Sequence, residues 1–191
     1  MAQKITSRSL KVVLVAILIA SEIVLARFLA IRTPIISIGF SFAPLMLAGM
    51  MLGWKYSTFV AVVADLIGAI LFPSGAFFIG YTLTAALTGF LAGILLYRPG
   101  GIKIDRSFIL RLLIYVLLST AVLHGGLNTL WIIITTGGAS NIVVPVRIAK
   151  QLIMAPIEFL TILALAKLFG ARINQLLLSK KSEPEEAVID D

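Results

Sequence analysis

The sequence contains no cysteine and a single histidine, His124. Without cysteine the chain forms no disulfide and holds no thiolate-bound metal cluster, and one histidine falls short of the usual zinc ligand sets. It also has no G-x-x-x-x-G-K-[ST] stretch, which would mark a P-loop ATPase. These absences argue against a metal site and against an ATPase within this chain.

Charged residues are also scarce. They make up 13% of the 191 residues, whereas 60% are hydrophobic and the mean hydropathy is +1.07. Soluble domains carry about 25% charged residues, so this composition indicates a protein that lies in a lipid bilayer. A transmembrane helix needs about 20 apolar residues, and the length allows about six of them with short connections.

The uncharged stretches predict an all-α membrane protein with six spans, near 10–29, 35–52, 56–72, 78–97, 109–135 and 145–168. The first apolar run continues to Leu25 without a small-x-small cleavage site before Arg27, so we expect a retained helix and not a signal peptide. Residues 1–172 form the predicted transmembrane domain, and the polar, acidic residues 173–191 form a predicted disordered tail. No internal repeat is visible, which disfavours a free-standing secondary carrier.

The 16 lysine and arginine residues are distributed unequally between the two sides of the six predicted spans. An even number of spans places both termini on one side, and twelve of the basic residues lie there. The other side has four, namely Arg27, Arg32, Arg147 and Lys150. The positive-inside rule therefore predicts that both termini are cytoplasmic. The net charge of +7 is then a topology signal and not a nucleic-acid footprint.

Several ionisable residues fall inside the predicted spans, where each costs about 2.5–3.5 kcal/mol at mid-depth. These residues are Glu22, Arg27, Asp65, Arg147, Lys150 and Glu158. On the sixth span, polar residues and one methionine fall within about 60° of one line along the helix, so this stripe must face the interior. Its members are Arg147, Lys150, Gln151, Met154 and Glu158. The alternative to a ligand site is internal ion pairing, for example of Lys150 with Asp65.

A second polar stripe lies on the fifth span, where His124, Asn128, Trp131 and Thr135 recur at intervals of four, three and four residues. Asn128 offers a donor and an acceptor, and Trp131 offers a flat face with one N–H group. Two alternatives remain open here. Trp131 is placed equally well for an aromatic-belt anchor, and a lone histidine is more often a packing residue than a proton relay.

Asp65 lies in the middle of the third span among small residues, where it can accept from the paired N–H donors of a ligand. Glu22 and Glu158 are alternatives for this role. Cations and aromatic residues toward the outside, above amide and carboxylate groups, suit a flat ligand. Such a ligand has N–H donors at one end and negative charge at the other.

Small residues recur at four-residue spacing, which allows helices to pack backbone to backbone. The sets are Ala16-x-x-x-Ala20, Gly49-x-x-x-Gly53 and Ala85-x-x-x-Gly89-x-x-x-Gly93. We expect the set in the fourth span to pack internally, and the Ala16/Ala20 pair is the best candidate for an external contact.

Three blocks in this order resemble the folate-specific substrate-binding (S) components of energy-coupling factor (ECF) vitamin transporters. They are "ADLIGAILFPSGAFFIGYTLTAALTGFLAG" (64–93), "GGLNTLW" (125–131) and "RIAKQLIMAPIE" (147–158). The six-span plan matches over residues 10 to 170, and "VAILIA" resembles the A-x-x-x-A element of the first helix.

The resemblance implies a multi-pass protein of a bacterial cell membrane that binds folate from outside with high affinity. It also implies docking, through the helix that holds Ala16 and Ala20, on a membrane coupling protein (T component) driven by two cytoplasmic ATPases. The chain would then be no enzyme and would need no cofactor, since ATP is used by the partner subunits. The loops at about 30–40 and 72–79 would close over the ligand.

Chemical matching then assigns roles to individual residues. Candidates for the glutamate tail or the ring oxygens of folate are Arg27, Arg147 and Lys150, while Arg32 steers the anion. Candidates for the donor–acceptor edge of the pterin are Asp65, Asn128 and Gln151. Candidates for stacking or for a lid are Phe72, Phe77, Phe78, Tyr81 and Trp131. The predicted gating loop contains Pro73, Ser74 and Gly75, in which proline is a rigid pivot and glycine supplies backbone freedom.

Two alternatives stay open. The first is an S component for another vitamin: the ring of Arg27, Arg147 and Lys150 disfavours cationic thiamine, but neutral riboflavin is compatible with it. The second is an intramembrane enzyme that acts on lipid. The sequence shows no H-E-x-x-H motif, no Gly-x-Ser-Gly protease motif and no aspartate cluster for a divalent metal, which disfavours this class.

Overall fold

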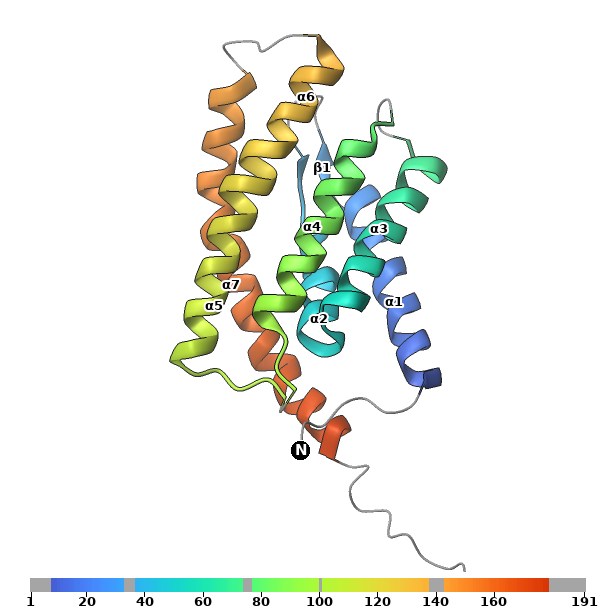
Figure 1. Cartoon of the computed structure of the whole chain (residues 1–191), viewed down its shortest axis with the longest axis vertical. Helices are drawn as coiled ribbons and strands as arrows, with labels where there is room; N and C mark the ends of the chain where they lie inside the picture. Colours follow the sequence, from blue (N-terminus) through green and yellow to red (C-terminus); the bar gives the residue numbers. More distant parts are fainter. Residues whose placement is uncertain (1–7, 33–36, 74–76, 100, 138–142, 179–191) are drawn as a thin grey trace, which may run out of the picture.

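The computed structural model describes residues 8–32, 37–73, 77–99, 101–137 and 143–178 (Figure 1). The chain begins with α1 (Arg8–Arg27), the strands β1 (Ile31–Arg32) and β2 (Ser37–Ile38), α2 (Phe42–Leu52), α3 (Trp54–Leu71) and α4 (Ile79–Leu96). It continues with α5 (Arg106–Leu117), the π-helix η1 (Leu118–Leu127), α6 (Asn128–Thr136) and α7 (Val143–Leu178). The predicted all-α architecture is confirmed, and a two-stranded antiparallel hairpin is added to it.

Five helical segments of the described chain are long and apolar enough to cross a membrane, and α5, η1 and α6 form one of them. The second predicted span, 35–52, differs from the others because its helical part is α2, with 11 residues. At 1.5 Å per residue α2 is about 16 Å long, roughly half the hydrocarbon thickness. Pro44 lies in its first turn, and a helix that began much earlier would lose a hydrogen bond at this proline.

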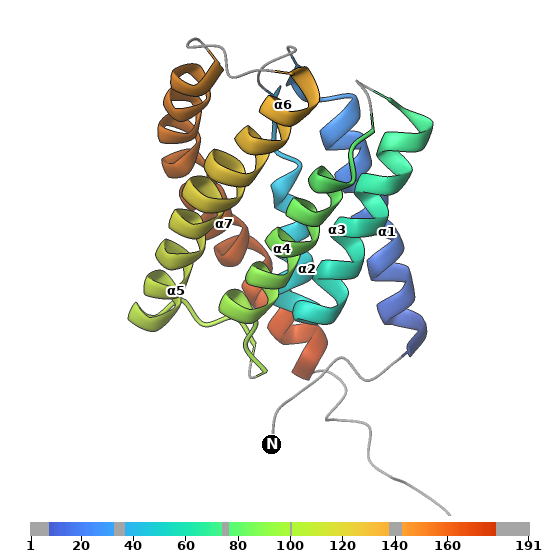
Figure 2. The ribbon, with the colours of Figure 1, turned by 45° about the horizontal axis from the view of Figure 1, so that its top comes forward.

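Helix α4 is the centre of the bundle. It packs against α2 and α3 on one side and against α5, η1 and α6 on the other. Helix α7 packs against α2, α5 and η1, and α1 packs against α2 and α3. The start of α1 and the end of α7 lie at one end of the molecule, and the hairpin lies toward the other (Figure 1). Figure 2 tilts the hairpin end forward and shows there the ends of α1, α3 and α6 and the start of α7.

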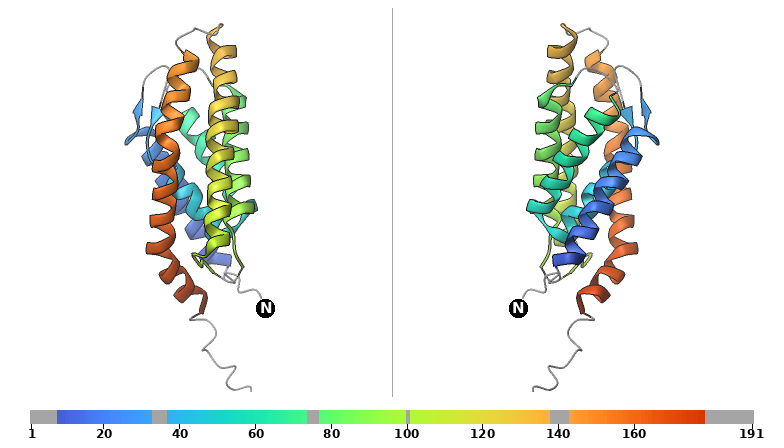
Figure 3. Two further views of the ribbon diagram at one scale, coloured as in Figure 1. Left: turned by 90° about the vertical axis from the view of Figure 1, so that its left-hand side faces the viewer. Right: turned by 90° about the vertical axis from the view of Figure 1, so that its right-hand side faces the viewer.

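Helix α7 bends gently along its length (Figure 3). Pro156 lies inside it, and proline removes one backbone hydrogen bond and bends a helix. The helix continues to Leu178, beyond the predicted domain boundary at 172. The rest of the predicted tail, 179–191, lies outside the described residues, and its disorder stays a prediction.

The predicted internal packing of the small residues of α4 is confirmed. A Cβ atom on Gly89 would lie 2.5 Å from the carbonyl oxygen of Ser57, and one on Gly93 would lie 2.1 Å from the Cα atom of Trp54. The Ser57 hydroxyl donates to the Gly89 carbonyl at 2.6 Å. Helices α3 and α4 therefore meet backbone to backbone, and no side chain fits between them at these positions.

We expect the substitution Gly93→Ala to destabilise the protein by about 1–3 kcal/mol, because the atoms it would displace belong to the backbone of Trp54. The matched control is Gly126→Ala, since the nearest contact of its added Cβ is the Ala121 carbonyl oxygen at 3.6 Å. Thermal unfolding in detergent measures both variants. Equal melting temperatures for the two would contradict the close approach of α3 and α4.

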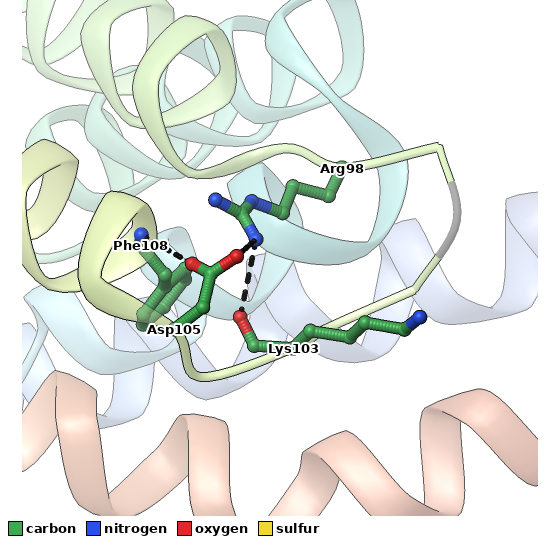
Figure 4. Close-up of polar contacts among 4 residues, drawn as sticks. All are labelled: Arg98, Lys103, Asp105 and Phe108. Carbon is green, nitrogen blue, oxygen red and sulfur yellow. Dashed lines mark hydrogen bonds and ion pairs between the residues drawn. The ribbon is translucent and has the colours of Figure 1, made fainter.

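The connection between α4 and α5 is held by one carboxylate (Figure 4). The Asp105 side chain caps α5 by accepting from the Phe108 backbone N–H at 2.7 Å, and it pairs with Arg98 at 2.8 Å. Arg98 also donates to the Lys103 carbonyl at 3.3 Å. The hydrogen bond from Arg98, together with the one from the Phe108 backbone, lowers the pKa of Asp105 from 3.8 to about 2.

This pairing predicts a pH dependence of stability. Because the folded-state pKa of Asp105 lies below the unfolded value, its contribution is complete above pH 3.8 and is lost as the pH falls toward about 2. We expect Asp105→Ala to lower the melting temperature at pH 7, and this difference from the wild type should shrink toward pH 2. Asp105→Asn keeps the capping acceptor, so its melting temperature at pH 7 should lie between those of Asp105→Ala and the wild type. A difference that is unchanged between pH 7 and pH 2 would contradict this role.

Candidate functional site

The polar stripe of α7 faces the bundle interior, as predicted. Gln151, Met154 and Glu158 are at most 8% exposed, whereas Leu152 is 72% and Ile153 is 64% exposed. Polar side chains thus point inward and apolar ones outward, which is the reverse of a soluble helix and is typical of a membrane bundle with a polar interior.

Helix α7 is joined to the long helix opposite it by hydrogen bonds from its polar stripe. The Arg147 Nε atom donates to the Thr129 hydroxyl at 3.0 Å, and the Gln151 amide donates to the Thr120 carbonyl at 3.2 Å. Deeper in the bundle, the Ser119 hydroxyl donates to Glu158 at 3.4 Å. Two of the buried polar residues of α7 therefore act partly as structural partners of η1.

The three carboxylates that the sequence offered for ligand recognition differ in their surroundings. Asp65 accepts from the Thr82 hydroxyl at 2.7 Å, and among the described residues it forms no ion pair with Lys150. Glu158 is bonded to Ser119. Among the described residues, the Glu22 Oε2 atom is buried without a hydrogen-bond partner, and Asp65 lies within its electrostatic reach. Glu22 is thus the carboxylate of the three that has a buried oxygen atom able to accept a further hydrogen bond.

Three predicted stacking residues form one aromatic cluster, which consists of Phe78, Tyr81 and Trp131. The Phe78 ring lies 5.5 Å from the Trp131 ring and 6.1 Å from the Tyr81 ring. The Trp131 indole N–H donates to the buried Thr84 hydroxyl at 2.9 Å, which ties α6 to α4 and points the indole inward. Gly80 makes room for the cluster, because a Cβ there would lie 2.4 Å from Phe78 and 2.7 Å from Trp131.

Arg27 lies at the end of α1 and reaches across to α3. Its Nη1 atom donates to the Phe72 carbonyl at 3.1 Å, and its guanidinium lies against Gly68, where a Cβ would be 2.7 Å from Nε. The Phe72 ring packs edge to face on Phe28 at 5.0 Å. Asp65 is within electrostatic reach of this guanidinium. Arg27, Phe72 and Asp65 thus form a second group on the α1–α3 side.

Helix α4 joins the two groups, because Thr82 bonds to Asp65 and Thr84 bonds to Trp131. Tyr81 also lies within electrostatic reach of Arg147 on α7. Sequence reasoning missed the hydroxyl partners Thr82, Thr84 and Thr129. The signal for Thr82 and Thr84 was their two-residue spacing in "GYTLTAALTGF", and Thr129 lies in "GGLNTLW", but nothing in the sequence assigned a partner to each hydroxyl group.

Other predicted residues lie apart from these groups. Phe77 is 56% exposed, Pro73 is exposed, and Thr135 is exposed and bonds to the Trp131 carbonyl. Ser74 and Gly75 lie outside the described residues, and the side chain of Arg32 is not among those described. Ala16 and Ala20 are exposed on α1, whereas the nearby Val15 and Leu18 are buried.

The described residues hold no cluster of three or more His, Cys, Asp or Glu side chains suited to a metal ion. What converges near the hairpin end of the bundle is an aromatic cluster, cationic groups on α1 and α7, and buried acceptors. Groups of these kinds are suited to binding and orienting a ligand between helices. Together with the apolar spans they indicate the class of a multi-span membrane protein with a polar interior.

Comparison with known proteins names the family within this class. The model of the family "ECF transporter, substrate-specific component" matches residues 10–166, so the chain belongs to this family. It is 37% identical to the folate transporter FolT of Clostridium novyi (strain NT) over 147 residues, which are 77% of this chain and 82% of the relative. It is 32% identical to FolT of Leuconostoc mesenteroides subsp. mesenteroides over 152 residues, 76% of this chain and 78% of the relative.

A solved structure agrees with these relatives. The crystal structure of FolT bound with folic acid has a TM-score of 0.70 and 33% identity, and covers 78% of this chain and 86% of that chain. The predicted family is confirmed. The chain is therefore a membrane component of an ECF-type transporter that provides substrate specificity, and not an enzyme.

Proposed function

We propose that this chain binds folate from the outer side of the membrane and delivers it inward as the S component of an ECF transporter. The observation that carries the proposal is its similarity, in sequence and in fold, to FolT bound with folic acid. The chemistry of the site supports it. Folate has a flat pterin ring with N–H donors at one end and two carboxylates at the other, and the described residues include groups for both.

We assign the dianionic glutamate of folate to Arg147, Lys150 and Arg27. These side chains are half-buried, and Arg147 lies near the aromatic cluster. A guanidinium binds a carboxylate through two parallel hydrogen bonds, which gives both strength and direction. Lys150 sits one turn from Arg147 on the same face of α7, so both cations can meet one ligand end.

We assign the pterin ring to the aromatic cluster, and we assign Phe72 and Phe77, which lie apart from this cluster, to the lid over the ligand. Asp65, Asn128 and Gln151 are assigned to its donor–acceptor edge. A flat ring that enters between Phe78, Tyr81 and Trp131 would gain contact area and stacking at low entropic cost. In this proposal Pro73, Ser74 and Gly75 form a loop that closes over the bound ring.

The proposal is tested by thermal unfolding of the detergent-purified full chain with folic acid, riboflavin or thiamine at micromolar concentration. A ligand at 100 times its Kd stabilises the folded state by about 2.7 kcal/mol, which raises the melting temperature measurably. We expect a shift with folic acid alone. A shift with riboflavin and none with folic acid would overturn the folate assignment and leave the ECF family assignment intact.

We further propose that uptake requires a membrane T component and two cytoplasmic ATPases, as membership of the ECF family implies, and the lack of a P-loop motif in the sequence agrees with this. We place the chain in the plasma membrane of a bacterium with both termini in the cytoplasm. The basic residues at the starts of α3 and α5 support this orientation. Ala16 and Ala20 give α1 a small, exposed face against which another helix can pack closely.

Vesicles that contain this chain alone should therefore bind folate at their surface without accumulating it. The expected result is a saturable amount of bound folate, equal to the number of accessible sites, that does not grow with time. Rapid filtration with radiolabelled folate measures it. Accumulation against a gradient by the lone chain would contradict the dependence on partner ATPases.

A further inference from the structure

His124 contacts Asn128, one of the residues predicted to bind the ligand. Asn128 begins α6 directly after η1, and its Nδ2 atom lies 3.1 Å from the Nδ1 atom of His124. With the amide in this orientation its NH2 group is the donor, and Nδ1 of His124 is then the acceptor and carries no proton. The neutral imidazole then has its proton on Nε2.

This contact leaves the other end of the Asn128 amide unused. Among the described residues, Asn128 Oδ1 is buried and has no hydrogen-bond partner. The Arg147 Nε atom, a nearby donor on α7, is engaged by Thr129. Buried acceptors are nearly always paired, so an orphaned carbonyl oxygen in a ligand site indicates a donor supplied by the ligand.

The local backbone explains how the pair is placed. His124 lies in the last turn of the π-helix η1, and the backbone N–H of Asn128 bonds to the carbonyl of Leu123, five residues earlier. π-helical turns in α-helices occur often at functional sites, because the wider turn re-aims the side chains that follow. The His124–Asn128 contact spans the point where the wide helix returns to α-helical geometry.

We propose that His124 is a positioning residue that fixes the Asn128 amide with its carbonyl oxygen free, so that this position selects an N–H donor of the ligand. The inference rests on the proposed folate site, in which the ligand donor is an N–H group of the pterin edge. A ligand that presents an acceptor at this point would face a carbonyl oxygen and bind weakly. His124 does not touch the ligand; it determines which end of Asn128 does.

The tautomer of His124 tests the proposal without any ligand. Because the chain has one histidine, labelling with 15N-histidine gives the signals of this ring alone, provided that the purification tag contains none. We expect a proton on Nε2 and a bare Nδ1. In Asn128→Asp the new carboxylate can only accept, so a proton should appear on Nδ1. A proton on Nδ1 in the wild type would overturn the proposal.

Folate binding tests the consequence. Asn128→Asp keeps an acceptor for the ligand, so it should bind folate at least about tenfold more tightly than Asn128→Leu. Likewise His124→Gln, whose carbonyl can accept from Asn128, should restore most of the affinity lost in His124→Leu. Equal affinities within either pair would overturn the proposal. Wild-type protein that binds no folate would refute the folate site, while the tautomer would still decide the orientation of the amide.

Discussion

Replacing Arg147 by glutamine is expected to weaken folate binding by about 10- to 100-fold. Arg147 is half-buried and donates to Thr129 through Nε, and in our proposal its guanidinium also binds the glutamate of folate. Hydrogen bonds to charged groups contribute about 1.5–3 kcal/mol, which corresponds to this loss of affinity. Isothermal titration calorimetry with the detergent-purified protein measures it.

Two controls separate ligand binding from folding. Arg106→Gln removes the same charge from the exposed start of α5 and should leave folate affinity unchanged. Pteroic acid, which lacks the glutamate, should bind the wild type and Arg147→Gln with similar affinity. If Arg147→Gln lowers the affinity for both ligands equally, Arg147 supports the structure and does not bind the glutamate.

Replacing both Ala16 and Ala20 by leucine is expected to reduce folate uptake by the assembled transporter at least about tenfold while leaving folate affinity unchanged. Both alanines are exposed on α1, away from the α2 and α3 contacts made by this helix. Leucine side chains at this spacing would keep a partner helix from close approach. Uptake into vesicles with the full complex and equilibrium binding to the lone chain are measured in parallel.

The matched control is Ala149→Leu, an equivalent change at an exposed position of α7. It should leave both uptake and binding near the wild-type values. If the α1 variant lost folate binding while still assembling with its partners, α1 would line the ligand site instead of the docking surface.

Periodic patterns in the sequence predicted much of this architecture. The sequence predicted which face of α7 points inward, because its polar residues form one helical stripe and such a stripe is too costly to expose to lipid. The internal packing of Gly89 and Gly93 followed from small residues at four-residue spacing, although the spacing did not identify α3 as the partner helix. Both inferences need only the helix repeat, which the sequence encodes directly.

Other features depend on tertiary contacts that no single segment encodes. The π-helix Leu118–Leu127 had no sequence signal, because the four-residue interval between His124 and Asn128 is equally typical of an α-helix. The hydroxyl groups of Thr82 and Thr84 form hydrogen bonds with Asp65 and Trp131, respectively, only because α4 packs on α3 and α6. The short α2 was different, since Pro44 did carry a signal for a late helix start.

Co-purification with folate shows whether this chain is the folate-binding component of its transporter. The full chain is expressed in cells supplied with folic acid, extracted in detergent and purified without added ligand. We predict an ultraviolet absorbance of folate in the protein peak, confirmed by mass spectrometry after denaturation, at about one folate per chain. Purified, folded protein that carries no folate and binds none when it is added back would show that the chain is not a folate-binding component.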